Sequence, residues 1–578
     1  MPTARSGGQI LVDTLVTQGV DVVFGVPGES YLAVLDALHD APIKFITNRQ
    51  EGGAAFMAEA YGKLTGRPGI CFVTRGPGAT NASIGVHTAQ QDSTPMILFI
   101  GQVGGDFVER EAFQEIDYRR MFGQMTKWVA QIDRAERIPE YVARAFQVAM
   151  SGRPGPVVLA LPEDMLTAMA IVADVAKVVP VQAAPAPAQM AQVHRLLAAA
   201  QRPLVLLGGG AWSMQACTDL QRFIERYQLP VACAFRFQDL FDNAHPNYVG
   251  DVGIGINPQL ARQIQEADLI LAIGPRLGEM TTGGYTLLCA PRPRQQLIHV
   301  HAGAEELGRV YQADLMINSG MAEFSAALQT LPELECGRWR EAVPAAREAY
   351  LAWQAQPPLF AEPSIKLNLW QVMQTLRTEL PRDTVLTNGA GNFASWGHRF
   401  WQYGDRSVGL RTQLAPTSGA MGYGVPAGIA AALIGNVQQR PRSVLTLAGD
   451  GDFMMNGQEL ATALQFGAGV LFIVFNNNMY GTIRMHQERH YPARLSGTTL
   501  QNPDFAALAR AYGAFGEMVD TTEQFSASLQ RARAHIAQSG GPALIELRYD
   551  GNLITPSATL MSMREEAQRV QRAETPTR

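Results

Sequence analysis

Two short polar turns follow apolar segments in the last third of the chain. The first, Gly-Asp-Gly-Asp-Phe at 449–453, comes after the run 443–448, and the second carries Asn477 after the run 470–475. If the two runs are neighbouring parallel strands, Asp450 and Asn477 lie at the carboxyl edge of one sheet, where α/β proteins bind ligands. Carboxylate, amide and backbone carbonyl oxygens suit a hard cation such as Mg²⁺. The pattern therefore predicts a diphosphate held through one divalent cation.

The glycines of the first turn have a separate use. Gly449 and Gly451 allow the backbone to approach a diphosphate, and Asp452 or a neighbour is expected to open a helix whose amino end favours negative charge. The alternative is purely structural, because Gly-Asp-Gly is a common turn and paired asparagines can end a strand. The strand-like runs on both sides favour the ligand site.

A second group of candidate residues lies near the amino terminus. Residues 46–62 read as the end of a strand followed by a helix of mostly small residues, with Glu51 at the turn between them. The alternative for Glu51 is a first-turn acid that is stabilised by the helix dipole. Further along, Gly-Pro-Gly at 76–78 predicts a rigid loop between a strand at 69–73 and a helix that starts near Asn81. We expect such a loop to position a ligand.

Taken together, these motifs resemble the signature of thiamine diphosphate (ThDP) enzymes. The resemblance implies that the metal binds Asp450, the side chain of Asn477 and the backbone carbonyl of Met479. It also implies that Glu51 hydrogen-bonds the aminopyrimidine ring of ThDP and so activates the cofactor. Met421 would be the bulky apolar residue beneath the cofactor. The other cofactor-binding positions implied by the resemblance are Gly76, Asn81, Asn392, Phe393, Gly419, Gly449, Gly451, Asp452, Tyr480 and Gly481.

Within this family, the likeness is closest to the large, catalytic subunit of acetolactate synthase and covers most of the chain. It implies that Phe113 and Gln114 lie on the substrate side, with plain core packing as the alternative for Phe113. Two departures from the acetolactate synthase pattern affect the choice of acceptor. Gly-Glu-Met at 278–280 replaces an Asp-Asp-Arg whose arginine holds the carboxylate of the second oxo acid, and His486 replaces a tryptophan.

One acid and two histidines are candidates for acid–base roles. Glu29 stands where some relatives that release aldehydes place an acid or a hydroxyl, so it is interpreted as a proton donor or as a screen against charged acceptors. The structural alternative is that Glu29 only begins the next helix. His486 and His490 are four residues apart on a predicted helix, and they either line the acceptor pocket or face solvent.

These expectations lead to a ThDP- and Mg²⁺-dependent carboligase. It would decarboxylate a 2-oxo acid, with pyruvate as the first choice, and transfer the acyl carbanion to a carbonyl acceptor. One alternative is a non-oxidative 2-oxo acid decarboxylase or a 2-hydroxyacyl lyase with Glu29 or His486 as proton source. Another is a flavin-linked 2-oxo acid oxidase, because acetolactate synthases hold FAD in the central domain and a glycine turn stands at 208–210. FAD is therefore a candidate cofactor.

Composition favours a cytoplasmic enzyme with small-molecule substrates. The 578 residues are 47% hydrophobic and carry a net charge of -5, with no Lys/Arg cluster for a nucleic acid or an anionic membrane. The five cysteines are scattered and odd in number, as expected in a reducing compartment. No apolar run is long enough to predict a membrane span.

The expected fold class is α/β, with three domains that each hold a mainly parallel sheet flanked by helices. The predicted division is a pyrimidine-binding domain at 1–175, a Pro/Ala linker at 176–190, a central domain at 191–335, a linker at 336–364, a diphosphate-binding domain at 365–555 and a tail at 556–578. The tail is interpreted as a lid or as a frayed helix. The family resemblance implies a homodimer or homotetramer with active sites at the subunit interface.

Overall fold

The computed structural model describes residues 3–334, 339–361, 365–404 and 411–574. It divides into two compact units, the first formed by Met1–Trp353 with Tyr403–Gln413 and the second by Gln354–Gln402 with Leu414–Arg578. Cys336 lies outside the described residues, and of the four cysteines within them Cys289 is exposed and the other three are buried. Among the described residues, no helix is both long and apolar enough to cross a membrane.

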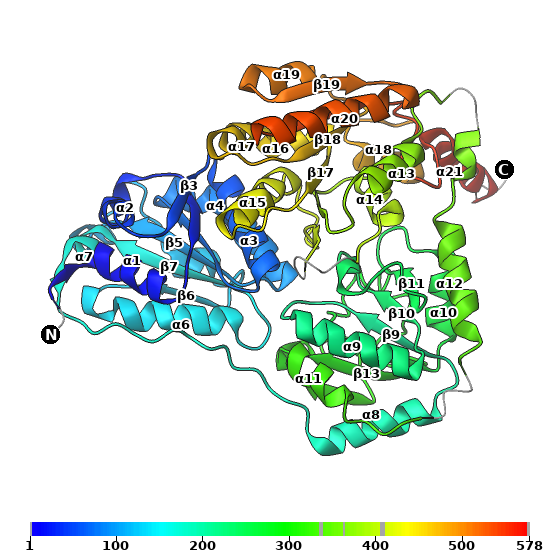
Figure 1. Ribbon diagram of the computed structural model, residues 1–578, viewed down its shortest axis with the longest axis horizontal. Helices are drawn as coiled ribbons and strands as arrows, with labels where there is room; N and C mark the ends of the chain where they lie inside the picture. Colours follow the sequence, from blue (N-terminus) through cyan, green and yellow to red (C-terminus); the bar gives the residue numbers. More distant parts are fainter. Residues whose placement is uncertain (1–2, 335–338, 362–364, 405–410, 575–578) are drawn as a thin grey trace. The chain divides into compact units, whose positions relative to one another are not determined.

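The first unit begins with a six-stranded sheet in the order β3-β2-β4-β5-β7-β6, with parallel pairing throughout. Helices α1 and α6 cover one face, and α3 and α4 lie on the other (Figure 1). A short antiparallel pair, β1 and β8, precedes and follows this sheet. The elements are β1 (Arg5–Ser6), α1 (Gly7–Thr17), β2 (Val22–Gly25), α2 (Leu32–His39), β3 (Lys44–Thr47), α3 (Glu51–Thr65), β4 (Gly69–Val73), α4 (Gly76–Asp92), β5 (Met96–Gln102), α5 (Tyr118–Phe122), β6 (Trp128–Gln131), α6 (Ile138–Met150), β7 (Pro156–Pro162), α7 (Glu163–Thr167) and β8 (Met169–Ala170).

Small residues explain how closely α3 packs in this domain. A Cβ on Gly85 of α4 would lie 2.4 Å from the Cβ of Ala55, and one on Gly69 would lie 1.8 Å from the carbonyl oxygen of Ala58. The backbones of α3, α4 and β4 therefore approach one another more closely than larger side chains would allow. This packing fixes the position of the first turn of α3, where Glu51 stands.

The rest of the first unit holds a second parallel sheet, in the order β11-β10-β9-β12-β13-β14. Counted within the domain, this is the order 3-2-1-4-5-6 that is common among dinucleotide-binding domains. Trp339 and Tyr350, from the stretch predicted as the second linker, belong to its core. The elements are α8 (Pro187–Ala199), β9 (Pro203–Leu207), α9 (Met214–Tyr227), β10 (Val231–Cys233), β11 (Tyr248–Asp251), α10 (Pro258–Glu266), β12 (Leu269–Ile273), β13 (Gln296–His301), β14 (Leu315–Asn318), α11 (Met321–Leu328) and α12 (Ala342–Trp353).

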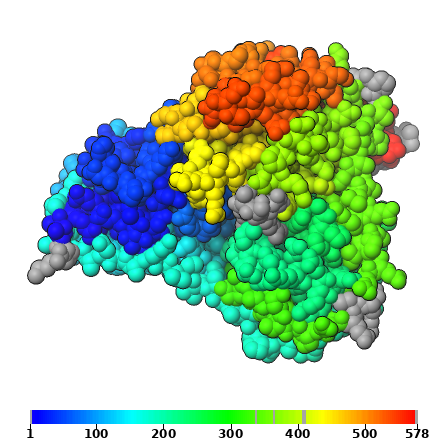
Figure 2. Space-filling view, in the orientation of Figure 1, coloured from blue at the N-terminus to red at the C-terminus, as the bar shows by residue number. Residues whose placement is uncertain are grey.

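The second unit is built on a sheet in the order β16-β15-β17-β18-β20-β19. Counted within each domain, the first and the last sheets share the order 2-1-3-4-6-5. Part of α19 and α20 reaches the surface as orange and red atoms (Figure 2). The elements are α13 (Leu369–Glu379), β15 (Val385–Asn388), α14 (Ala394–Phe400), β16 (Gln413–Leu414), α15 (Gly424–Val437), β17 (Val444–Gly449), α16 (Asp450–Asn456), α17 (Leu460–Phe466), β18 (Leu471–Asn476), α18 (Gly481–His490), α19 (Phe505–Tyr512), β19 (Phe515–Val519), α20 (Thr522–Ser539), β20 (Ala543–Arg548) and α21 (Leu560–Glu574).

The predicted fold class is confirmed, because the three sheets are mainly parallel and carry helices. The carboxyl-terminal tail is neither loose nor frayed within the described residues. Helix α21 packs along α18, and Arg564 bonds the carboxylate of the buried Glu488, with one N···O distance of 2.8 Å.

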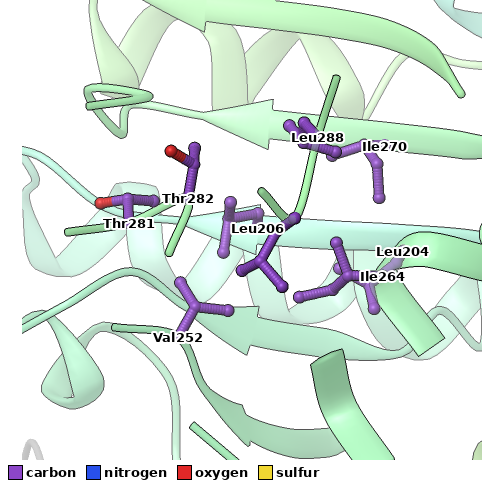
Figure 3. A pocket seen from close by; sticks show the side chains of 9 residues that line it. Leu204, Leu206, Val252, Ile264, Ile270, Thr281, Thr282 and Leu288 are labelled. Carbon is purple, nitrogen blue, oxygen red and sulfur yellow. The ribbon is translucent and has the colours of Figure 1, made fainter. Parts of the chain in front are cut away.

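A small apolar cavity lies in the central domain beside β9 and β12 (Figure 3). Its volume is about 10 Å³, and Leu206, Val252, Ile264 and Ile270 are among the residues that line it. A space of this size holds at most about one water molecule, so it is a packing defect and not a nucleotide site.

We expect Leu206→Ala to destabilise the first unit by about 3 kcal/mol, because it removes buried carbon atoms beside a cavity that already exists. The measurement is the shift of the thermal unfolding midpoint. Thr281→Ser, which also borders the cavity, is the matched control and should change the midpoint little. An unchanged midpoint for Leu206→Ala would show that the cavity wall collapses around the smaller side chain.

Candidate active site

Glu51 is the first residue of α3 and follows Gln50, which caps this helix. The side-chain oxygen of Gln50 accepts hydrogen bonds from the two backbone N–H groups after Glu51, at 2.5 and 3.1 Å. One carboxylate oxygen of Glu51 accepts a hydrogen bond from Asn81 Nδ2 at 2.9 Å, and a Cβ on Gly78 would lie 3.6 Å from the other. The first sheet therefore brings Glu51, Gly78 and Asn81 together beyond its strand ends.

The prediction that a helix starts near Asn81 is wrong, because α4 already begins at Gly76. The Gly-Pro-Gly segment is the first turn of this helix, a position where proline loses no hydrogen bond. The backbone N–H of Gly76 donates to the carbonyl oxygen of Gln114 at 2.9 Å, and a Cβ on Gly76 would lie 2.9 Å from that oxygen. Gly76 therefore fixes the loop that carries Gln114.

The loop around Gln114 presents Phe113 outward. Gln114 has a φ of 66°, and the carboxylate of Glu115 accepts backbone N–H bonds from Glu109 and Ala112 at 2.7 and 3.0 Å. Phe113 is 73% exposed in this chain. The alternative of plain core packing for Phe113 is therefore wrong.

In the second unit, Asp450 and Asn477 follow neighbouring strands as predicted. Strands β17 and β18 pair in parallel, with Gly449 opposite Phe475. Asp450 is 3% exposed. Its Oδ1 accepts a hydrogen bond from the N–H of Gly451 at 2.9 Å, and its Oδ2 accepts one from the N–H of Met479 at 3.2 Å. Burial raises the pKa of Asp450, and the hydrogen bonds that it accepts act against this shift.

Asn502 is a further residue of this group, which the sequence reasoning missed. Its Nδ2 donates to Asp450 Oδ2 at 2.8 Å and to the side-chain oxygen of Asn476 at 2.9 Å. The loop before α19 thereby holds both strand ends in place. Asn502 follows Asp450 by 52 residues, and a single Asn-Pro-Asp sequence gives no sign of this contact.

We expect Asn502→Ala to weaken Mg²⁺ binding about 10- to 100-fold, as for other residues that orient a metal ligand. The loss follows because Asp450 would keep its buried charge without one of its donors. The measurement is the Mg²⁺ concentration that gives half-maximal ThDP binding, read by quenching of tryptophan fluorescence. Gln501→Ala, at the exposed neighbouring position, is the control and should leave that concentration unchanged.

Aromatic rings cover both glycines of the first turn. A Cβ on Gly449 would lie 2.7 Å from the ring of Phe393, and one on Gly451 would lie 2.5 Å from the ring of Tyr480. Phe393 is buried and also approaches Phe475, with ring centroids 6.1 Å apart. Close packing inside the domain is therefore one reason for glycine at both positions.

Asp452 joins two loops of the second unit. Its Oδ1 accepts hydrogen bonds from the backbone N–H groups of Gly422 and Ala390 at 2.8 and 3.2 Å. The Gly422 bond fixes the loop that carries Met421, which is half-buried, and Gly419, which has a φ of 69°. The Ala390 bond fixes the loop after β15.

The start of α18 contacts that loop. The side-chain hydroxyl of Thr482 donates to Asn392 Oδ1 at 3.0 Å. The N–H of Gly481 donates to the carbonyl oxygen of Met479 at 2.9 Å. Because a carbonyl oxygen has two lone pairs, the Met479 oxygen retains capacity for a metal ion.

The candidates for acid–base roles are less buried than Asp450. Glu29 begins a short 3-10 helix, Glu29–Tyr31, as the structural alternative predicted, and its side chain is 67% exposed. His486 and His490 lie on α18 with ring centroids 6.2 Å apart, and both are exposed in this chain. Partial burial lowers the pKa of His486, and the neighbouring Arg489 and His490 lower it further.

The residues around Asp450 fit a divalent cation and a diphosphate. The carboxylate of Asp450 is buried and, among the described residues, forms no ion pair with a basic side chain. A bound cation would supply the missing positive charge. The predicted ligands offer one carboxylate, one amide and one carbonyl oxygen, which suits Mg²⁺ that also binds phosphate oxygens.

The glycine turn of the central domain is explained by packing. A Cβ on Gly209 would lie 2.0 Å from the carbonyl oxygen of Gly274, and one on Gly210 would lie 2.6 Å from that of Ser93. Trp212 donates its indole N–H to the carbonyl oxygen of Gly208 at 2.8 Å. The turn thus requires glycines whether or not a flavin binds.

Three protein-family models match the chain, each over strands of a different sheet. They describe the N-terminal TPP binding domain of thiamine pyrophosphate enzymes at residues 5–121, the central domain at 190–329 and the C-terminal TPP binding domain at 389–547.

Relatives over nearly the full length are acetolactate synthases. The isozyme 2 large subunit of Escherichia coli is 30% identical over 97% of this chain and 99% of its own length. The large subunit of Parasynechococcus marenigrum is 33% identical over 94% of this chain and 88% of its own length. The mitochondrial catalytic subunit of Saccharomyces cerevisiae is 29% identical over 94% of this chain and 81% of its own length. The chain therefore belongs to the thiamine pyrophosphate enzyme family and is similar to the large subunit of acetolactate synthase.

Proposed function

We propose that this protein is a ThDP- and Mg²⁺-dependent carboligase that decarboxylates a 2-oxo acid, with pyruvate as donor, and joins the remaining acyl unit to a carbonyl acceptor. When bound, ThDP supplies the electron sink for loss of CO₂. The observation that carries the proposal is the placement of Glu51 at the first turn of α3 beside Asn81. A protein that only stored the cofactor would need the Asp450 group but no carboxylate at this place.

In this proposal, different residues of the chain have different roles. Asp450, Asn477 and the carbonyl oxygen of Met479 would hold Mg²⁺ and through it the diphosphate. Glu51 would exchange a proton with the aminopyrimidine ring. Met421 would provide an apolar support beneath the cofactor. From the family resemblance, we also propose a homodimer or homotetramer whose active sites combine residues of two subunits.

The test is incubation of the purified protein with ThDP, Mg²⁺ and pyruvate, with and without benzaldehyde or 2-oxobutyrate, and NMR identification of the products. Acetolactate or a mixed acyloin supports the proposal and identifies the acceptor. Acetaldehyde as the only product would show that the protein is a decarboxylase and not a carboligase. Bound ThDP without consumption of pyruvate would show that the donor substrate belongs to another chemical class, and 2-hydroxyacyl compounds would be tested next.

The strand order of the central sheet favours one further candidate, a flavin-linked 2-oxo acid oxidase. The order 3-2-1-4-5-6 is that of dinucleotide-binding domains. The packing of Gly209 and Gly210 provides a different reason for the glycine turn, so the carboligase remains the preferred function. Flavin released from the denatured protein in proportion to the protein, together with bleaching of the native protein by pyruvate, would favour the oxidase.

A further inference from the structure

The chain after β20 turns back over two of the proposed metal ligands. A Cβ on Gly551 would lie 2.4 Å from Met479 Cε and 3.3 Å from the carbonyl oxygen of Asn477. A Cβ on Gly481 would lie 2.8 Å from the Cδ1 atom of Ile554. The segment between β20 and α21 therefore lies directly against the turn that carries both proposed ligands.

Helix α21 packs on the same turn and runs beside α18 (Figure 1). Leu560 of α21 and Ile554 form a small apolar cluster with Met485 of α18, and the side chains of Met479 and Met563 pack against it. Only three of its described members are buried, so apolar burial alone holds the helix weakly. Because the side chain of Met479 packs here, the position of its carbonyl oxygen depends on how α21 is docked.

Hydrogen bonds join α21 to the segment before it. The backbone N–H of Leu560 donates to the carbonyl oxygen of Asn552, and the N–H of Met561 donates to the side-chain oxygen of Asn552, both at 2.9 Å. Asn552 directly follows Gly551, the residue that lies against Met479. A displacement of α21 would therefore also displace the segment that contacts the ligand turn.

One ion pair holds α21 on α18. Arg564 Nε donates to Glu488 Oε2 at 2.8 Å, and Arg564 Nη2 donates to Glu488 Oε1. The side chain of Glu488 is 1% exposed and that of Arg564 is 40% exposed. The bond to Arg564 lowers the pKa of Glu488, so the carboxylate is ionised although it is shielded from water. A buried charge without its partner is strongly unfavourable, so the pair favours the docked position of α21.

We propose, on the basis of the ThDP- and Mg²⁺-dependent function above, that Arg564 is a positioning residue for the metal site. Its ion pair with Glu488 holds α21 and the preceding segment against the turn that carries Asn477 and Met479. In this role Arg564 acts through the turn and does not bind the metal. The docked helix orders the two ligand residues before the cation binds, which removes part of the cost of ordering them on binding.

The experiment compares the full chain with its variants Arg564→Gln, Arg564→Lys and Glu488→Gln/Arg564→Gln. Titration with Mg²⁺ at fixed ThDP, read by quenching of tryptophan fluorescence, gives the Mg²⁺ concentration at half-maximal ThDP binding. We expect Arg564→Gln to raise this concentration about tenfold, as for other residues that orient a metal ligand. Arg564→Lys keeps the charge and should restore most of the affinity. The double variant should restore it as well, because it leaves no unpaired buried charge.

The matched control is Arg569→Gln, which breaks an exposed arginine–glutamate pair with Glu566 on the same helix. It should leave the Mg²⁺ concentration unchanged. The thermal unfolding midpoint, measured without Mg²⁺ and ThDP, shows whether each variant is folded at the temperature of the titration. An unchanged Mg²⁺ concentration in folded Arg564→Gln, or an equal rise in Arg569→Gln, would overturn the role of Arg564.

Met479→Ala tests the same coupling without changing the ion pair. It keeps the backbone carbonyl but removes the side chain that packs against the apolar cluster, so we expect a similar rise of about tenfold. An unchanged Mg²⁺ concentration in this variant would overturn the inference even if Arg564→Gln did not fold. Mg²⁺-dependent ThDP binding by the parent, with no effect of either variant, would leave the proposed function intact. A parent chain that binds no ThDP, or binds it without Mg²⁺, would overturn the proposed metal site and the inference with it.

Discussion

Glu51→Gln is expected to lower kcat about 10²- to 10⁴-fold, the usual contribution of a general acid–base group. Glutamine keeps the size of the side chain and an oxygen that accepts the bond from Asn81, so the fold of the first turn of α3 should remain intact. What glutamine lacks is the ability to take up and return a proton. The cofactor should therefore still bind while turnover is almost lost.

Two measurements separate binding from proton transfer. Isothermal titration calorimetry gives the affinity for ThDP, which we expect to change by less than about tenfold. Exchange of the C2 proton of bound ThDP for deuterium, stopped by acid and read by NMR, should slow in parallel with kcat. Glu140→Gln, an exposed glutamate on α6, is the control. Unchanged turnover in Glu51→Gln would remove the central residue of the proposed function.

The positions of Asp450 and Asn477, which we propose as metal ligands, could be predicted from the sequence because both residues follow mostly apolar strands. Strands that are buried on both faces leave continuous hydrophobic runs, and the polar residues directly after them must lie at the sheet edge. The same reasoning placed Glu51 at the start of a helix. Local pattern was sufficient in these cases because each side chain is positioned by the element next to it in the chain.

Contacts between distant loops could not be predicted in this way. Asn502 reaches Asp450 from the loop before α19. Arg75 forms ion pairs with Glu29 and Glu163, and each of these three residues follows a different strand. Neither contact leaves a periodic pattern in the sequence, because a side-chain hydrogen bond between loops requires only that the two loops lie close together in the folded chain. The start of α4 was misplaced for a related reason. Gly-Pro-Gly is compatible with both a loop and a first helical turn, and the packing of Gly76 against Gln114 selects the helix.

Asp450→Asn is the second change for which we expect a very large effect. It removes the carboxylate charge of the proposed metal ligands while keeping the shape of the side chain, so Mg²⁺ affinity should fall by more than about 100-fold. In the parent, affinity should also fall as the pH is lowered. Burial raises the pKa of Asp450, so a proton competes with the cation at a higher pH than it would on an exposed aspartate. Calorimetric titration of Mg²⁺ in the presence of ThDP at several pH values measures both effects.

The two inactive variants together test whether an active site is shared between subunits. If Glu51 of one subunit works with Asp450 of another, a heterodimer of Glu51→Gln and Asp450→Asn chains contains one intact site and one doubly altered site. Co-expression with two different tags and purification through both should then give about half of the parent activity per dimer. If each site used Glu51 and Asp450 of the same chain, every site in the heterodimer would carry one defect and no activity would return. Recovery in the heterodimer, with neither homodimer active, would therefore place the two halves of the site on different subunits.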